Sequence, residues 1–499
     1  MESLSFERGE APRSSSLPDR KVSGILNPGS SHGGEAPVIV IGAGFAGASA
    51  ALTLADAGRP VLLLEAAKAP GGRARSFPDP RSGRELDWGP HLFMKANPAL
   101  REFLGRIGAS ASLRFEPSLD LTYRLADGAA RGGVRNERLS FPARGGAPAS
   151  LLALLRWRGP RLAARLSIAR GLRRVLKEGP PAVESPAAES KNAGETVEQM
   201  LDRLGQGASE REWFWEPFSG AVLNMPAGEG SGELLRRVMC EAFGPGLAGA
   251  SLGAPAEALG PFWADRALDA IRRAGGEVKM AAPVRRIRIE GGAVRGVTLS
   301  GGESIEASVV IAAVPPPALL RLLPAEAFGG KSPWRDLGRL RSASIATAYL
   351  WLDHPCPGPA YEALVAERWE WLFRPGAGGL KAGDLRTGEK EPDAPVAFLC
   401  GGADSLASAP RSEIESAARE AAGRLLPDFG LRRVLVVRER AATWANGAGE
   451  QAHRTAAETP VDGLILAGDW TATGLPATCE GAVRSGFRAA EAAQDPKGG

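Results

Sequence analysis

Apolar runs and a helical pattern follow one another closely over residues 36–66. Val38–Ile41 and Val61–Leu64 contain no polar residue, which is typical of strands buried on both faces of a parallel sheet. Between them, residues 46–57 are rich in Ala and Leu at helical spacing, and Gly58 stands where helices commonly end. The pattern therefore predicts a strand, a tight glycine turn, a helix and a second strand, as in a β-α-β unit.

Two later segments of the chain also predict apolar, buried strands. Residues 277–316 alternate, with Gly-Gly turns at 291–292 and 301–302, and predict a β-meander that ends in a buried strand. Residues 464–468 predict another strand, followed by a loop and an Ala-rich helix from about Gly481. We therefore predict an α/β fold with a discontinuous, Rossmann-like nucleotide-binding domain and an inserted α+β substrate-binding domain. The first would comprise residues 36–105, 265–325 and 435–492, and the second residues 106–264 and 326–434.

The composition of the chain argues against several classes of protein, such as nucleic-acid-binding, metal-binding and membrane-spanning proteins. The chain has 499 residues, enough for two domains, and its formal net charge of +4 is too small to indicate nucleic-acid binding. Its four cysteines include no CxxC pair and its four histidines no HxxxH pair, so we predict reduced thiols and no bound metal. Residues 1–35 are polar and predict a disordered extension rather than a secretory signal. Residues 178–195 predict a surface loop, and no apolar run is long enough to span a membrane.

The glycine turn carries a recognisable motif. Gly42, Gly44 and Gly47 form G-x-G-x-x-G directly between the first strand and the helix. The first glycine permits the tight turn, the second lets a pyrophosphate approach the backbone, and the third lets the helix pack on the strand. Glu65 closes the second strand, where a carboxylate can accept hydrogen bonds from ribose hydroxyls. The motif predicts a bound dinucleotide with its pyrophosphate at the helix N-terminus.

Three further segments are similar to one flavoprotein superfamily. PGGRARS at 70–76, LDWGPHLFM at 86–94 and LILAGDWTATGLPATCEGAVRSG at 464–486, with the glycine motif, resemble the amine oxidase and phytoene desaturase flavoproteins. The resemblance implies an FAD-binding domain of that type, with the start of the last helix at the flavin N1/O2 edge. A helix N-terminus there would stabilise the negative charge of a reduced flavin. The residues expected at FAD are Gly42, Ala43, Gly44, Phe45, Ala46, Gly47, Glu65, Ala66, Gly72, Arg73, Gly89, Pro90, His91, Val284, Gly468, Asp469, Leu475, Pro476, Ala477 and Thr478.

A segment outside these motifs points to a reaction. FWEPFSGAVLNMP at 214–226 resembles the hydroxysqualene dehydroxylases, the squalene-associated flavoenzymes of bacterial hopanoid synthesis. The resemblance covers about residues 37–490, except the loop at 178–195. It implies that hydroxysqualene and reduced FAD give squalene, water and oxidised FAD. A carotenoid-type desaturase, which would use the flavin oxidatively on a similar polyene, is the alternative, and a non-catalytic lipid escort protein is another. A flavin amine oxidase is less favoured, because Thr478 stands where those enzymes place an aromatic residue.

Three side chains are catalytic candidates under this resemblance. The departing hydroxide needs a proton, and Glu216 is the candidate acid, since burial would keep it protonated; a structural ion pair with an Arg is equally consistent. His91 either faces the substrate or packs in the core. Asn224 is a positioning donor or a turn residue ahead of Pro226. Candidates for an apolar pocket, each also a core candidate, are Phe214, Trp215, Phe218, Leu223, Phe262 and Trp263.

Residues 151–176 carry seven arginines and no acidic residue, interleaved with leucines and Trp157. This composition is typical of helices at a membrane interface with arginines on anionic headgroups, although ordinary amphipathic surface helices look similar. An isoprenoid substrate favours the membrane interpretation. We therefore expect a cytoplasmic protein, peripheral on the inner face of the bacterial plasma membrane, with hydroxysqualene-forming synthases as partners and without nucleic acid.

Overall fold

A computed structural model describes residues 36–127, 133–142, 146–181, 194–244, 249–324, 327, 334–375, 394–402, 406 and 408–494. The predicted N-terminal extension, residues 1–35, and residues 182–193 of the predicted surface loop lie outside this part of the chain.

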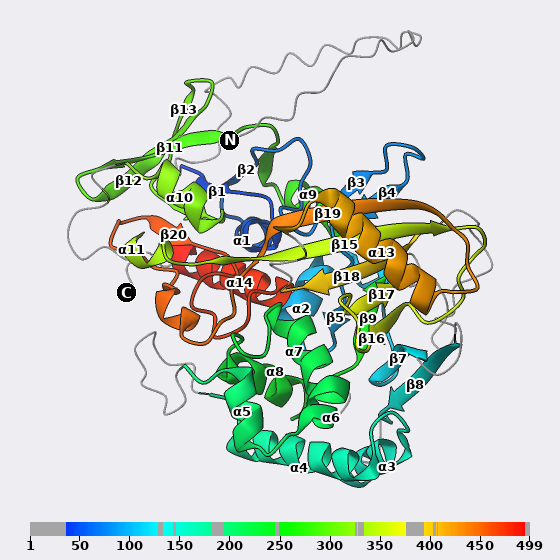
Figure 1. Cartoon of the computed structure of the whole chain (residues 1–499). Helices are drawn as coiled ribbons and strands as arrows, with labels where there is room; N and C mark the ends of the chain where they lie inside the picture. Colours follow the sequence, from blue (N-terminus) through cyan, green and yellow to red (C-terminus); the bar gives the residue numbers. More distant parts are fainter. Residues whose placement is uncertain are drawn as a thin grey trace. The chain divides into compact units, whose positions relative to one another are not determined.

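A five-stranded parallel sheet lies at the centre of the region that carries the glycine motif (Figure 1). Its strand order is β10 (Glu277–Lys279), β2 (Val61–Leu64), β1 (Val38–Ile41), β14 (Val310–Ala312) and β20 (Leu464–Leu466). The predicted bounds of β1 and β2 are confirmed, and every residue of β1, β2, β14 and β20 is buried. The sheet thus brings together strands from the start, the middle and the end of the chain.

The predicted β-meander over residues 277–316 is only partly right. β10 leaves it and pairs in parallel with Leu62–Leu64 at the edge of the central sheet. The remaining strands, β11 (Val284–Glu290), β12 (Ala293–Leu299) and β13 (Ser304–Glu306), form a separate antiparallel sheet, and β14 returns to the central one. A short strand has the same residue pattern whether its partner is the next strand or a distant one, so the pattern could not separate the two cases.

Alternate residues of the central strands pack against two different layers. Val38 and Val40 belong to one core with the helices α1 (Phe45–Asp56), α2 (Pro98–Arg106), α9 (Asp265–Arg273) and α14 (Cys479–Gln494). Ile39 and Ile41 belong to a second core with the β11–β13 sheet, α10 (Pro316–Leu322) and α11 (Trp334–Leu337). The central sheet is therefore covered on both faces, as its uninterrupted apolar strands require.

A seven-stranded sheet forms the second large layer. Its order is β19 (Leu431–Trp444), β15 (Ser342–Leu352), β18 (Val396–Gly401), β17 (Trp371–Phe373), β16 (Tyr361–Leu364), β7 (Asp120–Asp127) and β8 (Gly133–Ser140). Tyr349 and Trp351 share a core with helices on one face, and Ala348 and Leu350 share another with α13 (Arg411–Leu425). The helices of the first face are α3 (Gly146–Arg156), α4 (Leu162–Glu178), α5 (Val197–Arg203), α7 (Glu216–Leu223) and α8 (Gly232–Phe243).

Smaller elements complete the fold. The short helix α6 (Ala208–Glu210) precedes α7. A two-stranded sheet consists of β3 (Ser76–Pro78) and β4 (Glu85–Asp87). A three-stranded sheet has the order β5 (Phe93–Met94), β9 (Leu252–Pro255) and β6 (Leu113–Phe115). Among the described helices, none combines the length and the apolar character that a bilayer crossing needs. The predicted domain boundaries stay a prediction.

The helices α1 and α14 approach closely through glycines. A methyl group on Gly486 of α14 would overlap the Ser49 hydroxyl and the Ala46 carbonyl of α1, and one on Gly47 would overlap the Gly42 carbonyl. Cβ-free positions therefore allow the last helix to pack on the first helix, which itself packs on the glycine turn.

Replacing Gly486 by Ala should consequently destabilise the protein. Because α1 and α14 would have to move apart, we expect a loss of about 1–3 kcal/mol, measured by urea unfolding followed by tryptophan fluorescence. The control is Gly423→Ala in α13, where a methyl group meets no atom within 4 Å and should stabilise the helix by up to about 1 kcal/mol. Equal stability of the two variants would contradict the packing described.

Candidate functional site

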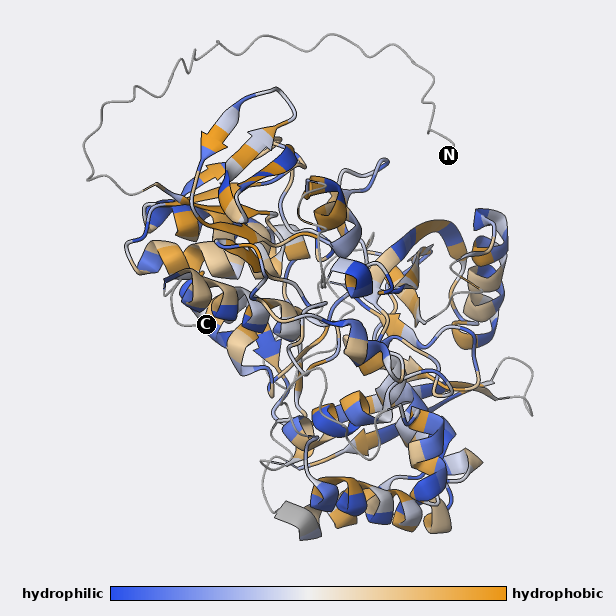
Figure 2. Cartoon of the chain, turned by 90° about the vertical axis from the view of Figure 1, so that its left-hand side faces the viewer, coloured by the Kyte–Doolittle hydropathy of each residue, from blue (hydrophilic) through white to orange (hydrophobic). Residues whose placement is uncertain are grey.

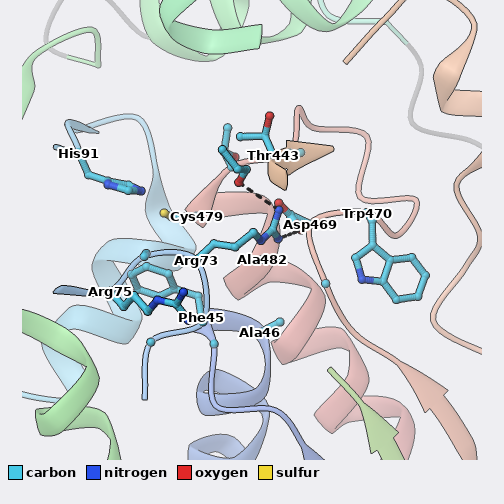
Figure 3. Close-up of a pocket in the computed structure, with 18 of the residues that line it drawn as sticks. Phe45, Ala46, Arg73, Arg75, His91, Thr443, Asp469, Trp470, Cys479 and Ala482 are labelled. Atoms are coloured by element: carbon cyan, nitrogen blue, oxygen red, sulfur yellow. Dashed lines mark hydrogen bonds and ion pairs between the residues drawn. The ribbon is translucent and has the colours of Figure 1, made fainter. Parts of the chain in front are cut away.

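A cavity of about 930 Å³ lies where the strands β1, β2 and β14 end and extends to the seven-stranded sheet. Ligands of open α/β sheets bind at the carboxyl ends of the strands, so this is the expected edge. Residues from widely separated segments line it, and Figure 3 shows Phe45, Arg73, His91, Asp469 and Cys479 around it. Of the residues predicted at FAD, all except Ala43 and Gly47 line this cavity.

The glycine turn has the geometry that the motif predicts. Gly42 has φ +103°, and a Cβ there would lie 2.6 Å from the Ala313 carbonyl oxygen, so only glycine fits. A Cβ on Gly44 would meet no protein atom within 4 Å, which leaves the backbone on that side open to a ligand. Gly44 precedes α1 and has no side chain to cap it, so the N–H groups of the first turn can bind a phosphate.

Glu65 is fixed by backbone donors. Its Oε2 accepts a hydrogen bond from the Ala43 N–H at 2.7 Å, and its Oε1 accepts one from the Ala67 N–H at 2.8 Å. An ionised carboxylate has about four acceptor positions, so two remain for hydroxyl groups of a ligand. Val284 lines the cavity beside it, which is consistent with an adenosine at this end.

An ion pair joins two motifs that are far apart in the sequence. The Arg73 Nη2 lies 2.5 Å from the Asp469 Oδ1, and the Arg73 Nη1 donates to the Ala442 carbonyl at 3.4 Å (Figure 3). Asp469 is buried, whereas a third of the Arg73 side chain is accessible. The pair therefore holds a guanidinium at the cavity, where its remaining N–H groups can bind a phosphate.

The start of α14 also faces the cavity. Pro476, Ala477, Thr478 and Cys479 line it, and the helix begins at Cys479 rather than near Gly481. The Thr478 hydroxyl accepts a hydrogen bond from the Gly481 N–H at 3.2 Å, which caps the helix. The positive end of α14 is thus directed at this part of the cavity.

A buried network that the sequence did not reveal holds this segment in place. Arg454, only 2% exposed, donates to the carbonyls of Asp469 and Leu475 and to the Asn446 Oδ1. Asn446 also accepts from the Ala477 N–H at 2.8 Å and donates to the Leu223 carbonyl at 2.8 Å. Burial lowers the pKa of Arg454 to about 10, so it stays charged at neutral pH. Neither residue belongs to a recognisable motif, and no local pattern signals such long-range contacts.

His91 is held as a neutral imidazole. Burial lowers its pKa, and its Nδ1 lies 2.8 Å from the Gly89 carbonyl oxygen. Because a carbonyl only accepts, Nδ1 carries the proton and Nε2 is left as an acceptor. Since it lines the cavity, His91 can accept a hydrogen bond from a ligand there.

Of the other two catalytic candidates, only Asn224 lines the cavity. Glu216 has an exposed side chain and is not among the residues that line the cavity, although partial burial raises its pKa. Asn224 does line the cavity, but its amide is engaged by the protein: Nδ2 donates to Thr443 and Ser344, and Oδ1 accepts from the Gly402 N–H. It ends α7 in the left-handed conformation, with φ 53°. These contacts of Asn224 are those expected of a turn residue ahead of Pro226.

The apolar candidates turn out to be core residues. Phe214, Trp215 and Leu223 are buried in one core, against which Phe218 packs, and Phe262 and Trp263 are buried in the core beside α1. None of the six lines the cavity. The apolar part of the lining comes instead from Trp88, Leu92, Phe93, Met94, Val222, Val238, Ile345, Trp371, Phe373 and Leu399. Phe93, Met94, Trp371 and Phe373 belong to strands of two or three residues, and the others are scattered over loops, helices and longer strands, so no local pattern marks them. No cluster of possible metal ligands occurs within the described part of the chain.

Comparison with known proteins places the chain among flavoproteins. The model of the family described as flavin containing amine oxidoreductase matches residues 45–494. A crystal structure of an oxidoreductase from Methanosarcina mazei covers 91% of this chain and 100% of its own, with a TM-score of 0.69 and 19% identity. The chain belongs to the flavin-containing amine oxidoreductase family. The prediction of an FAD-dependent oxidoreductase with this fold is confirmed, and the cavity lining described above fits FAD.

Two curated relatives have names that state a particular reaction. A hydroxysqualene dehydroxylase from Rhodopseudomonas palustris is 31% identical over 91% of this chain and 97% of its own length. A chloroplastic/chromoplastic 15-cis-phytoene desaturase from Arabidopsis thaliana is 25% identical over 90% of this chain and 78% of its own. The resemblance to hydroxysqualene dehydroxylases is confirmed at the level of sequence similarity.

Loss of the Asn446 amide should weaken both folding and cofactor retention. Asn446→Ala removes the hydrogen-bond partner of the Arg454 Nη2, the Ala477 N–H and the Leu223 carbonyl oxygen in a buried place, so we expect a loss of at least about 2 kcal/mol. Urea unfolding gives the stability, and the flavin-to-protein absorbance ratio after gel filtration gives retention. The exposed Asn136 of β8 supplies the control, since Asn136→Ala should change stability by no more than about 0.5 kcal/mol. An Asn446→Ala protein as stable as the control would show that the network contributes little.

Proposed function

We propose that the chain removes the allylic hydroxyl group of hydroxysqualene reductively and releases squalene and water. The observation that carries the proposal is the lining of one cavity, which combines residues suited to FAD with a set of aromatic and aliphatic side chains. An apolar pocket with few polar groups suits a long isoprenoid. The similarity to the Rhodopseudomonas palustris hydroxysqualene dehydroxylase, over nearly the full length of both chains, supports the same substrate.

The residues predicted at FAD are assigned by their places along the cavity. Glu65 and Val284 would hold the adenosine, and the start of α1 with Arg73 would hold the pyrophosphate. The segment from Gly468 to Thr478 would lie along the ribityl chain and the flavin. When bound in its reduced form, FAD supplies the hydride that replaces the hydroxyl group. His91, through its Nε2, would accept a hydrogen bond from the substrate hydroxyl and orient it.

A carotenoid-type desaturase remains the second candidate. It would need the same cofactor and the same apolar lining, and the Arabidopsis thaliana phytoene desaturase is similar over most of this chain, at the lower identity of 25%. An amine oxidase is less favoured, since the cavity wall carries Thr478 where an aromatic residue would be expected.

The reaction can be tested directly. The purified protein is reduced anaerobically, hydroxysqualene is added in detergent, and flavin absorbance is followed while products are analysed by mass spectrometry. We expect reoxidation of the flavin together with an equal amount of squalene.

Three outcomes would contradict the proposal. Flavin that stays reduced, with no squalene formed, would exclude dehydroxylation. Desaturated products from phytoene and the oxidised protein would favour the desaturase. Binding of either isoprenoid without any flavin turnover would indicate a lipid escort protein.

A membrane-facing surface is the second part of the proposal. The exposed large hydrophobic side chains of the described residues all belong to α3 and α4, namely Leu151, Leu152, Leu155, Leu162 and Leu166. These helices lie at the bottom of Figure 1, and Figure 2 shows hydrophobic and hydrophilic residues mixed along this end. Trp157, in contrast, is only 1% exposed and packs on Trp213 and Tyr123 in the core. The leucines, not the tryptophan, would therefore enter the lipid.

Exposed cations accompany these leucines. Arg156, Arg158, Arg161, Arg170, Arg173 and Arg174 are exposed on the same two helices and the turn between them. We infer that this surface binds the anionic inner face of a bacterial plasma membrane, the reservoir of an isoprenoid substrate and the site of hydroxysqualene-forming synthases.

Charge reversal on α4 should weaken membrane binding. Each Arg near an anionic surface contributes about 1 kcal/mol, so Arg170, Arg173 and Arg174 changed together to Glu should lower the partition coefficient at least about 100-fold. The measurement is flotation with vesicles that contain phosphatidylserine. The control, with the same change in net charge, replaces the exposed Arg295, Arg411 and Arg440 by Glu and should keep binding. Equal loss in both variants would show that only net charge matters.

A further inference from the structure

We propose that Glu370 is the acid that gives a proton to the departing hydroxyl oxygen. The inference rests on the proposed dehydroxylation and replaces Glu216 in that role. Glu370 lines the cavity, together with Trp371, Phe373 and Leu399 of its apolar part.

The backbone of Glu370 is fixed between two strands. It directly precedes β17, its N–H donates to the Leu399 carbonyl at 3.0 Å, and its carbonyl accepts from the Leu364 N–H at 2.8 Å. The side chain therefore projects from the seven-stranded sheet, a rigid element, and not from a loop. Catalytic groups held in this way keep a defined position relative to a bound substrate.

The two carboxyl oxygens of Glu370 have different surroundings. Oε2 accepts a hydrogen bond from the Gly401 N–H at 3.1 Å. Oε1 makes no hydrogen bond to any described residue. The facing residue on α7 is Gly220, where a Cβ would lie 3.6 Å from each of the two oxygens. Because position 220 has no side chain and itself lines the cavity, Oε1 remains open to a ligand.

The electrostatic setting raises the pKa of this carboxyl group towards neutral pH. Burial raises the pKa of Glu370 to about 7, and only the hydrogen bond from Gly401 opposes the shift. The titratable neighbour on β18, Cys400, has a pKa raised by burial and by Glu370, so it is a neutral thiol. Asn224 on α7 is neutral, and no Lys or Arg of the described residues forms an ion pair with Glu370. A carboxyl group with a pKa near the working pH is the efficient choice for general acid catalysis.

The other acidic side chains that line the cavity form hydrogen bonds or ion pairs within the protein. Glu65 accepts from two backbone N–H groups, Asp469 pairs with Arg73, and Glu241 lies 3.6 Å from Arg484. Glu480 pairs with Arg484 and accepts from the Leu100 N–H, and the Glu439 Oε1 accepts from the Ala441 N–H at 3.3 Å. His91 uses its only proton on the Gly89 carbonyl. Glu370 also accepts one backbone hydrogen bond, but its Oε1 has no hydrogen bond or ion pair to a described residue, and burial raises its pKa to about 7.

The step balances in atoms and charge. The allylic C–O bond breaks, the oxygen takes the proton from Glu370, and the product is water. The carbon gains the hydride that the reduced cofactor supplies under the proposed function. Glu370 becomes a carboxylate and recovers its proton from solvent before the next turnover.

The test compares variants in a single anaerobic turnover of the reduced holoenzyme with hydroxysqualene. Glu370→Gln keeps an acceptor for the Gly401 N–H but has no acidic proton, so flavin reoxidation should slow by about 10²–10⁴-fold. In the unmodified protein the rate should fall as the pH rises above about 7, where the carboxyl group loses its proton. The Gln variant should lack this decline, while its FAD content and its binding of squalene stay unchanged.

Two further variants separate the outcomes. Glu216→Gln tests the competing acid, and Glu212→Gln is a control at an exposed carboxyl on the segment before α7. A Glu370→Gln protein that reacts at the normal rate, or that keeps the decline above pH 7, would overturn the inference, as would a loss confined to Glu216→Gln. If the unmodified protein itself forms no squalene, the proposed function fails, and this result is distinct from any difference among variants.

Discussion

The structure depends on a parallel sheet whose strands are apolar on both faces. Four of its strands expose no residue to water, so the sheet is stable only when a layer covers each side. Helices from the start and the end of the chain provide one layer, and the β11–β13 sheet with α10 and α11 provides the other. Because all five strands run in the same direction, their carboxyl ends meet at one edge. The glycine turn, Glu65 and the segment around Asp469 follow three of these ends, which is why residues far apart in the sequence share a cavity.

Features that depend on neighbouring residues could be predicted from the sequence. The bounds of β1 and β2, the turn at Gly42, and the position of Glu65 follow from short apolar runs and from the steric needs of a tight turn. Of the residues that motifs with a fixed order predicted at FAD, all except Ala43 and Gly47 line the cavity. These features are local, so a single segment contains the information.

Features that depend on distant partners could not be predicted in the same way. β10 has the pattern of a meander strand but pairs with β2, more than two hundred residues earlier. Glu216 lies within residues 214–226, the segment that resembles the hydroxysqualene dehydroxylases, yet its side chain is exposed to solvent. Glu370, in contrast, precedes a three-residue strand that has no motif. Arg454 and Asn446 look like ordinary loop residues until their partners on α7 and near α14 are known. Burial, which sets the chemistry of such groups, is a property of the assembled fold.

The leucines exposed on α3 and α4 have a consequence for how the molecule behaves away from lipid. Five such side chains gathered on two helices form an apolar surface that water solvates poorly, and the same surface on another copy is an equally good partner. If this surface binds membranes as proposed, self-association and bilayer adsorption would compete for one patch in dilute aqueous buffer. The balance between them shifts with protein concentration and with the area of membrane on offer. Detergent or lipid added during purification would occupy the patch and favour single copies.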